Sequence, residues 1–195
     1  MPKFAANISL LFNDLPFLDR IPAARDAGFD AVEILFPYDI AAKDIRARLQ
    51  SCNMPLVLIN TPPPNWANGD RGFAAIPGGE ARFRNDFKRA LRFADVLGAG
   101  MIHIMSGLAS GPQARATLID NLTWACETAP DRKLTIEPIN PTDMPGYFLN
   151  DFDLAAEVLD AVNAPNLALQ FDAYHAQMIT GDLFATWTKH GHRAA

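Results

Sequence analysis

The feature that most constrains the fold of this chain is a repeat in which a short apolar run is followed by a longer amphipathic stretch. One period takes roughly 25–35 residues, which is the length of a strand followed by a helix. The apolar runs are nearly continuous, as is typical of strands that are covered on both faces. We expect strands at residues 4–12, 31–36, 56–60, 101–105, 134–139 and 167–174.

The amphipathic stretches between these runs predict helices. In residues 81–97, for example, apolar side chains recur at spacings of three and four and therefore share one helix face. The expected helices lie at residues 15–27, 41–50, 81–97, 113–127 and 151–162, and residues 181–195 begin as a sixth. A helix after each strand returns the chain to a parallel strand, which predicts an α/β fold with a parallel sheet.

The length of the chain limits how much of such an architecture it holds. A closed (β/α)8 TIM barrel takes about 250 residues, or about 31 per unit, so 195 residues hold about six units. We therefore expect an incomplete TIM barrel of the (β/α)8 type. In this interpretation residues 1–195 form one domain that lacks the last two βα units and is open between its first and sixth strands.

Charge and composition exclude several classes of protein. Seventeen Lys and Arg residues against 22 Asp and Glu residues give a net charge of −5, which disfavours nucleic-acid binding. No apolar stretch is long enough to span a membrane and no signal-peptide pattern is present, so we expect a cytoplasmic protein. Cys52 and Cys126 lack metal-binding or disulfide spacing and are expected to be buried thiols. Motifs for nucleotide binding or serine hydrolysis are also missing from the sequence.

Two acidic residues stand near the carboxyl ends of otherwise apolar strands. Glu137 lies in the fifth expected strand, and Asp172 lies in the sixth. Neighbouring parallel strands are about 4.8 Å apart, so the two side chains can reach one point, where their repulsion favours a divalent cation. Oxygen ligands suit Mg²⁺ or Mn²⁺. The pattern alone leaves another interpretation equally open, in which Glu137 pairs with a buried Arg or caps a helix and Asp172 begins a turn.

Further polar residues interrupt the apolar runs. His175 follows Asp172 closely, and we expect it to contact a substrate or to support a metal ligand. His103 and Glu33 lie inside apolar strands, where a polar side chain must be hydrogen-bonded internally or face a site. For His103 this leaves a hydrogen-bonded core imidazole or a substrate contact. For Glu33 it leaves a brace to a backbone amide or a catalytic role.

Two long connections, residues 61–80 and 140–150, follow the carboxyl ends of strands. Barrels of this type carry their active sites at that end of the sheet. In the first connection, Trp66 can exclude water and Arg71 can clamp a carboxylate, so we expect both residues to bind a small acidic substrate. The alternative for this connection is a passive surface excursion.

Longer strings show a resemblance to a known family. The segments FAANISLLFNDLPFLDRIPAARDAGFDAVEILFPYD, LTIEPINPTDMPGYFLN and APNLALQFDAYHAQ resemble the hydroxypyruvate isomerase family of xylose isomerase-like (β/α)8 barrels. The likeness extends to about residue 189. It implies interconversion of hydroxypyruvate and tartronate semialdehyde through a metal-stabilised enediolate, with a divalent metal and no organic cofactor.

The resemblance also implies roles for particular residues. The family holds its cation with a Glu in the IEP motif, an Asp in the FDxYH motif, a Gln or His, and a second Glu. Glu137 and Asp172 match the first two ligands, and the other two have no counterpart in this sequence. The two Glu residues form the acid/base pair of the family, so Glu137 is the expected catalytic residue.

Several alternatives to this function stay open. They are a related 2-oxo sugar-acid isomerase, a ketose epimerase, and a catalytically inactive truncated form. A DNA-repair endonuclease on the same barrel is disfavoured, because the chain has only four His and a net charge of −5. The expected partner is a small sugar acid, with neither nucleic acid nor a membrane involved, and the formation of a homo-oligomer is left open.

Overall fold

The computed structural model describes residues 1–63, 67 and 69–195. Contacts within the chain divide it into two compact units. The first unit comprises residues 1–62 and 88–102, and the second comprises residues 63–87 and 103–195. The boundary between the units falls inside helix α3 (Glu80–Leu97) and inside strand β4 (Met101–His103).

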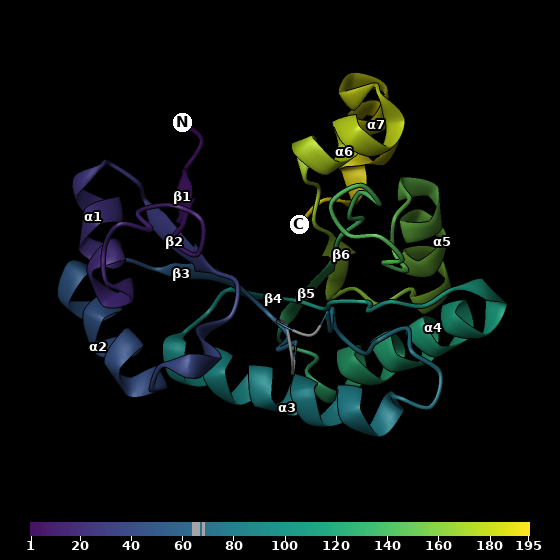
Figure 1. Cartoon of the computed structure of the whole chain (residues 1–195), viewed down its shortest axis with the longest axis horizontal. Coiled ribbons are helices and arrows are strands. Elements are labelled where there is room, and N and C mark those ends of the chain that lie inside the picture. The colour runs from purple at the N-terminus through teal and green to yellow at the C-terminus, as the bar shows by residue number, and fades with distance from the viewer. Residues whose placement is uncertain (64–66, 68) are drawn as a thin grey trace. The chain divides into compact units, whose positions relative to one another are not determined.

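The first unit begins with two strand–helix repeats and a third strand (Figure 1). Its elements are β1 (Ala5–Asn7), η1 (Phe17–Asp19), α1 (Arg20–Asp26), β2 (Ala31–Ile34), η2 (Pro37–Asp39), α2 (Ala42–Cys52) and β3 (Leu56–Asn60). β1 pairs with β2 and β2 pairs with β3, both in parallel. Helix α2 ends at Asn53, which adopts a left-handed conformation with a φ of 51° and so stops the helix before β3.

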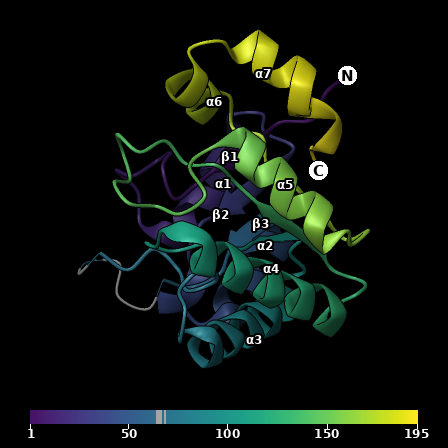
Figure 2. The same ribbon diagram turned by 90° about the vertical axis from the view of Figure 1, so that its right-hand side faces the viewer.

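The second unit continues the same alternation. Its elements are β5 (Lys133–Ile136), β6 (Leu167–Leu169), α4 (Gly111–Thr128), α5 (Phe152–Val162), α6 (Ala173–Thr180), α7 (Leu183–His190) and η4 (Gly191–Arg193). β5 and β6 are parallel, and the amide of Ile104 donates to the carbonyl of Thr135 at 2.8 Å. Helices α4 and α5 lie next to each other in this unit (Figures 1 and 2).

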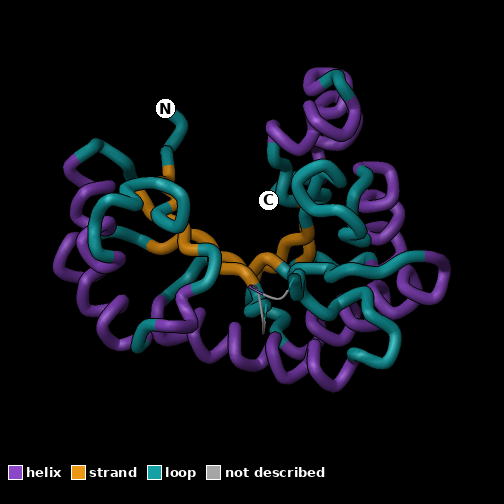
Figure 3. The backbone as a smooth tube through the Cα atoms, viewed as in Figure 1, coloured by secondary structure: helices purple, strands orange, loops and turns teal. Residues whose placement is uncertain are grey.

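The strands follow one another in the sheet order β1-β2-β3-β4-β5-β6. This order is the one that successive βα units produce, because each helix carries the chain to the next parallel strand. Figure 3 distinguishes the strands, in orange, from the helices, in purple. The expected α/β fold class, an incomplete TIM-type barrel with about six βα units, is confirmed. In the part of the chain that the structure describes, no helix combines the length and the apolar character that a membrane span requires.

Many buried side chains come from the predicted strands and helices, whereas Phe4, Leu10 and Leu11 of the first apolar run are exposed. In the second unit, the aromatic rings of Phe83 and Phe87 on α3 pack edge-on against Trp124 of α4, with centroids about 6 Å apart.

Both cysteines are free and buried, as expected. Burial, together with the nearby charge of Glu127, raises the pKa of the Cys126 thiol to about 11.

Two expected strands are much shorter than their apolar runs. β1 ends at Asn7, because the Asn7 side chain accepts a hydrogen bond from the amide of Ser9 and begins a turn. β6 ends at Leu169, so the prediction that this strand continues to residue 174 was wrong. There the Asp172 side chain accepts from the amide of His175 at 3.0 Å and starts helix α6.

The C-terminal residues also differ from the prediction. Instead of one helix that begins at residue 181, the structure has α6, a break at Gly181 with a φ of 75°, and α7. Asp182 caps α7 by accepting from the amide of Ala185 at 2.9 Å. After η4, Ala194 forms a parallel bridge with Leu169, so the last residues occupy an edge of β6.

Candidate active site

Two carboxylates meet beyond the carboxyl ends of β5 and β6 in the second unit. Glu137 directly follows β5, and Asp172 is the N-cap residue of α6. One potential ligand atom from each of Glu137, Asp172 and His175 lies within 4.8 Å of the other two. Glu137 is only 7% exposed, whereas Asp172 and His175 are half-buried. The structure therefore brings the two predicted carboxylates together and adds His175 to them.

An amide at the end of β6 orients Glu137. The Gln170 side chain donates from Nε2 to Oε2 of Glu137 at 3.1 Å. The hydroxyl of Thr135 donates to Oε1 of Gln170 at 3.1 Å, which fixes the oxygen end of that amide. Sequence reasoning missed Gln170. The one feature of the sequence that points to Gln170 is that a polar residue interrupts the apolar run that begins at Leu167.

The imidazole of His175 is held by Asn140, whose side chain is fully buried. Nδ1 of His175 lies 2.9 Å from Nδ2 of Asn140, and the backbone amide of Asn140 also donates to it at 3.4 Å. Asn140 lies four residues after the end of β5, and His175 lies in the first turn of α6. The two strand ends are thus connected through this pair.

Asp143 and Tyr174 extend the hydrogen bonds of this pair. The Asp143 carboxylate accepts from Nδ2 of Asn140 at 3.0 Å and from the Tyr174 hydroxyl at 2.8 Å. These hydrogen bonds, first that of Asn140 and then that of Tyr174, lower the pKa of Asp143. The same contact raises the pKa of Tyr174. Sequence reasoning missed both residues, because neither interrupts an apolar run.

His103 ends β4 and is buried, with 1% of its surface exposed. Its Nδ1 lies 3.7 Å from Oε2 of Glu137, and within the described residues neither ring nitrogen has a hydrogen-bond partner. The burial that was expected for a core imidazole is present, but the expected internal hydrogen bonds do not form with any residue that the structure describes. Burial and, to a lesser degree, the charge of His175 lower the pKa of His103 to about 3.

This pKa predicts how stability depends on pH. His103 titrates near 6.5 in the unfolded chain and near 3 in the folded one, so only the unfolded state takes up its proton between these values. The stabilisation is present above pH 6.5 and is lost as the pH falls, at up to about 1.4 kcal/mol per pH unit. We expect the free energy of unfolding in urea to fall between pH 7.5 and 5 by about 2 kcal/mol more than that of His103→Gln. Parallel curves for the two proteins would contradict this prediction.

Arg71 lies on a segment that runs against the end of β4. Gly72 forms a bridge with Ser106, and the amide of Ala75 donates to the Ser106 carbonyl at 2.7 Å. Gly72 has a φ of 100°, and a Cβ atom there would lie 2.3 Å from the carbonyl oxygen of Met105, so only glycine permits this approach. The Arg71 guanidinium donates to the Asp70 carbonyl at 2.9 Å. The predicted partner of Arg71, Trp66, lies outside the described residues.

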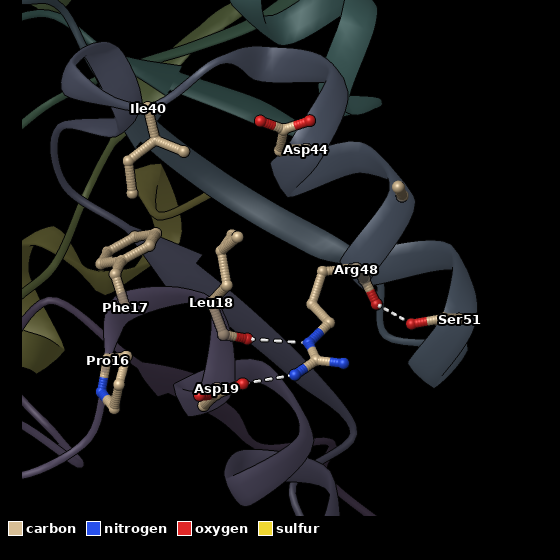
Figure 4. A pocket seen from close by; sticks show the side chains of 9 residues that line it. Pro16, Phe17, Leu18, Asp19, Ile40, Asp44, Arg48 and Ser51 are labelled. Carbon is tan, nitrogen blue, oxygen red and sulfur yellow. Dashed lines mark hydrogen bonds and ion pairs between the residues drawn. The ribbon is translucent and has the colours of Figure 1, made fainter.

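The first unit contains Glu33 and a groove. Glu33 accepts from Nδ2 of Asn7 at 3.0 Å across the β1–β2 pair, so its observed partner is a side-chain amide. A groove of about 840 Å³ lies between η1 and α2 (Figure 4). There Arg48 binds the Leu18 carbonyl and the Asp19 carboxylate. Because the Arg48 guanidinium already binds these two groups, we propose no reaction in the groove.

Parallel βα units with acidic residues beyond the carboxyl ends of the strands are the arrangement of an α/β-barrel enzyme. The family model of the xylose isomerase-like TIM barrel matches residues 21–195, and the chain belongs to this family. The 2-oxo-tetronate isomerase of Cupriavidus necator is 48% identical over 189 residues, which are 94% of this chain and 73% of that protein. The hydroxypyruvate isomerase of Escherichia coli is 39% identical over 195 residues, 97% of this chain and 76% of that protein. By these relationships the chain is an isomerase.

The crystal structure of a Brucella melitensis protein, described as an AP endonuclease of family 2, matches the whole chain. The TM-score is 0.95 at 42% sequence identity, and the match covers 100% of this chain and 77% of the other. The chain therefore shares the fold of that protein over its full length.

Proposed function

We propose that the chain isomerises small 2-oxo sugar acids, with hydroxypyruvate and 2-oxo-tetronate as the substrates to test first. The observation that carries the proposal is the convergence of Glu137, Asp172 and His175 in a chain 48% identical to a 2-oxo-tetronate isomerase. Both acids contain a carboxylate, a carbonyl at C2 and a hydroxyl at C3. They differ by a hydroxymethyl group on C3, so one mechanism serves both.

The site fits a divalent cation. Two carboxylates with ligand atoms within 4.8 Å of each other repel, and a cation between them removes the repulsion. Glu137 and Asp172 would hold this ion, and carboxylate ligands suit Mg²⁺ or Mn²⁺. When bound, such an ion supplies Lewis-acid polarisation of the substrate oxygens, which acidifies the neighbouring C–H bond.

The side chains of the site carry out the proton transfer in this proposal. Glu137 removes the proton from C3, and the electron pair forms the C2–C3 double bond of an enediolate. The proton returns to C2 while the hydroxyl proton moves from the C3 oxygen to the C2 oxygen, so that hydroxypyruvate becomes tartronate semialdehyde. The orientation of Glu137 by Gln170 supports this assignment, because a base must be held at a fixed position relative to the carbon.

The remaining predicted residues bind the substrate in this proposal. His175 donates a hydrogen bond to a substrate oxygen, and the neutral ring of His103 offers nitrogens that the described residues leave unbonded. Arg71 pairs with the substrate carboxylate, since its segment is held beside the end of β4. For Trp66 a substrate contact stays a prediction.

An endonuclease function has less support in this chain. Endonucleases that use the same barrel require several zinc ligands, many of them His, and a basic face for the phosphates. The cluster contains one His among its three potential ligands, and the chain carries a net charge of −5. Both observations favour a small acidic substrate that is bound locally over a nucleic acid.

The direct test of the proposal is whether the chain isomerises these acids and whether the rate depends on a divalent cation. With hydroxypyruvate or 2-oxo-tetronate and added MgCl2 or MnCl2, we expect turnover that proton NMR in D2O follows as deuterium enters the substrate carbon. Removal of the cation with EDTA is expected to lower the rate by at least about 100-fold, and readdition is expected to restore it. Turnover that is unchanged by EDTA would contradict the metal assignment. Failure with both acids, beside an active E. coli relative, would contradict the proposed function.

A further inference from the structure

The strongest unassigned feature of the site is the hydrogen bonding around Nδ1 of His175. A neutral imidazole carries one proton, on either Nδ1 or Nε2, and the partner of one nitrogen decides which. The nitrogen with the proton donates, whereas the other offers only a lone pair. The tautomer of His175 therefore decides whether its second nitrogen donates to a ligand or accepts from one.

The orientation of the Asn140 amide is fixed by its two other contacts. Oδ1 of Asn140 accepts from the backbone amide of Asp143 at 2.9 Å, so this end of the side chain is the oxygen. Nδ2 donates one hydrogen to the Asp143 carboxylate at 3.0 Å, and a carboxylate there accepts only. The second hydrogen of Nδ2 then faces Nδ1 of His175, 2.9 Å away.

A second donor points to the same conclusion. The backbone amide of Asn140 is 3.4 Å from Nδ1 of His175, and a backbone N–H can only donate. Two donors therefore face one ring nitrogen. The Tyr174 hydroxyl, which donates to Asp143 at 2.8 Å, adds a further hydrogen bond to the carboxylate that fixes the amide.

We propose that Asn140 is a positioning residue that keeps the neutral His175 ring protonated at Nε2, so that His175 donates a hydrogen bond from Nε2 to the substrate. Nε2 then has no lone pair for a cation, which leaves Glu137 and Asp172 as the ligands in the cluster. The donor role toward the substrate rests on the proposed function. The position of the proton does not, because it follows from contacts within the free chain.

The tautomer is measured without substrate, by long-range ¹H–¹⁵N correlation spectra of the histidine rings at alkaline pH. His175 is assigned by the loss of its signals in His175→Gln. The exposed His192 serves as an internal reference for a ring that exchanges between its tautomers in water. We expect His175 to show one form, with a lone pair on Nδ1 and the proton on Nε2. A proton on Nδ1, or averaging like that of His192, overturns the proposal.

Asn140→Asp keeps the shape of the side chain but replaces the nitrogen that faces His175 Nδ1 and the Asp143 carboxylate with an oxygen. Its carboxylate accepts where the amide donated, so we expect Nδ1 of His175 to become protonated. Asn166→Asp is the matched control, because the Asn166 amide donates to the carbonyls of Cys126, Ala129 and Arg132. That variant is expected to leave the His175 signals as in the wild type. An Asn140→Asp protein with an unchanged His175 spectrum overturns the role of Asn140.

The catalytic consequence is measured separately. With a substrate that the wild type isomerises, Asn140→Asp is expected to lower kcat by about 100-fold, since a donor to the reacting oxygen is lost. Wild-type kcat in that variant, together with a shifted tautomer, would contradict the donor role. An inactive wild type with the expected ring spectrum would instead count against the proposed function and leave the tautomer assignment standing.

Discussion

Glu137→Gln is expected to lower kcat for isomerisation by about 10³-fold or more. The substitution keeps the shape of the side chain but removes both the base and one negative charge from the cluster. Gln170 can still donate to the new side chain, so its orientation is largely kept. The measurement is the initial rate of isomerisation at saturating MgCl2 or MnCl2, with kcat and KM determined separately.

A matched substitution separates chemistry from charge. Glu157→Gln makes the same change on α5, where Glu157 is exposed and pairs with Arg115 at 3.1 Å. Exposed pairs of this kind contribute little to stability, so we expect wild-type kcat and nearly wild-type stability. If Glu137→Gln retained a kcat within tenfold of the wild type, Glu137 would not be the base.

Stability gives a second readout for the same variant. Glu137 is 7% exposed and lies close to the Asp172 carboxylate, so without a cation its charge is repelled at short range. We therefore expect Glu137→Gln to unfold at the same urea concentration as the metal-free wild type or at a higher one. Loss of activity with retained stability excludes unfolding as the cause.

The repeat was sufficient to predict the fold because it depends on burial. Each apolar run predicted a strand but did not show where that strand ends. Ile8 lies beyond β1 and is still fully buried, so an apolar side chain continues where the strand has ended. The turn after Asn7 and the cap at Asp172 come from side-chain hydrogen bonds to the backbone, which hydrophobic periodicity does not register.

The candidate site was predictable only in part, for a similar reason. Acidic residues in apolar runs are conspicuous, so Glu137 and Asp172 were found from the sequence. Gln170, Asp143 and Tyr174 are ordinary polar residues whose importance depends on which groups the fold places beside them. The absence of a hydrogen-bond partner for His103, within the described residues, likewise requires the positions of every neighbour.

Asp172 has two roles in the structure that two substitutions can separate. Its carboxylate belongs to the acidic cluster, and one of its oxygens caps α6. Asn is as good an N-cap as Asp, so Asp172→Asn keeps the cap and removes the charge, whereas Asp172→Ala removes both. We expect each variant to bind Mn²⁺ at least about 100-fold more weakly in calorimetric titrations, because a carboxylate ligand is lost.

The stability of the two variants should differ although their metal affinities do not. Without metal, Asp172→Ala is expected to lose about 1 kcal/mol in free energy of unfolding, and Asp172→Asn is expected to lose little. Asp182, which caps α7 in the same way, provides the control, since its variants should repeat the stability difference and bind Mn²⁺ as the wild type does. Wild-type Mn²⁺ affinity in Asp172→Asn would remove Asp172 from the metal site. An Asp172→Ala protein as stable as Asp172→Asn would mean that the cap contributes nothing and that α6 is held by its packing alone.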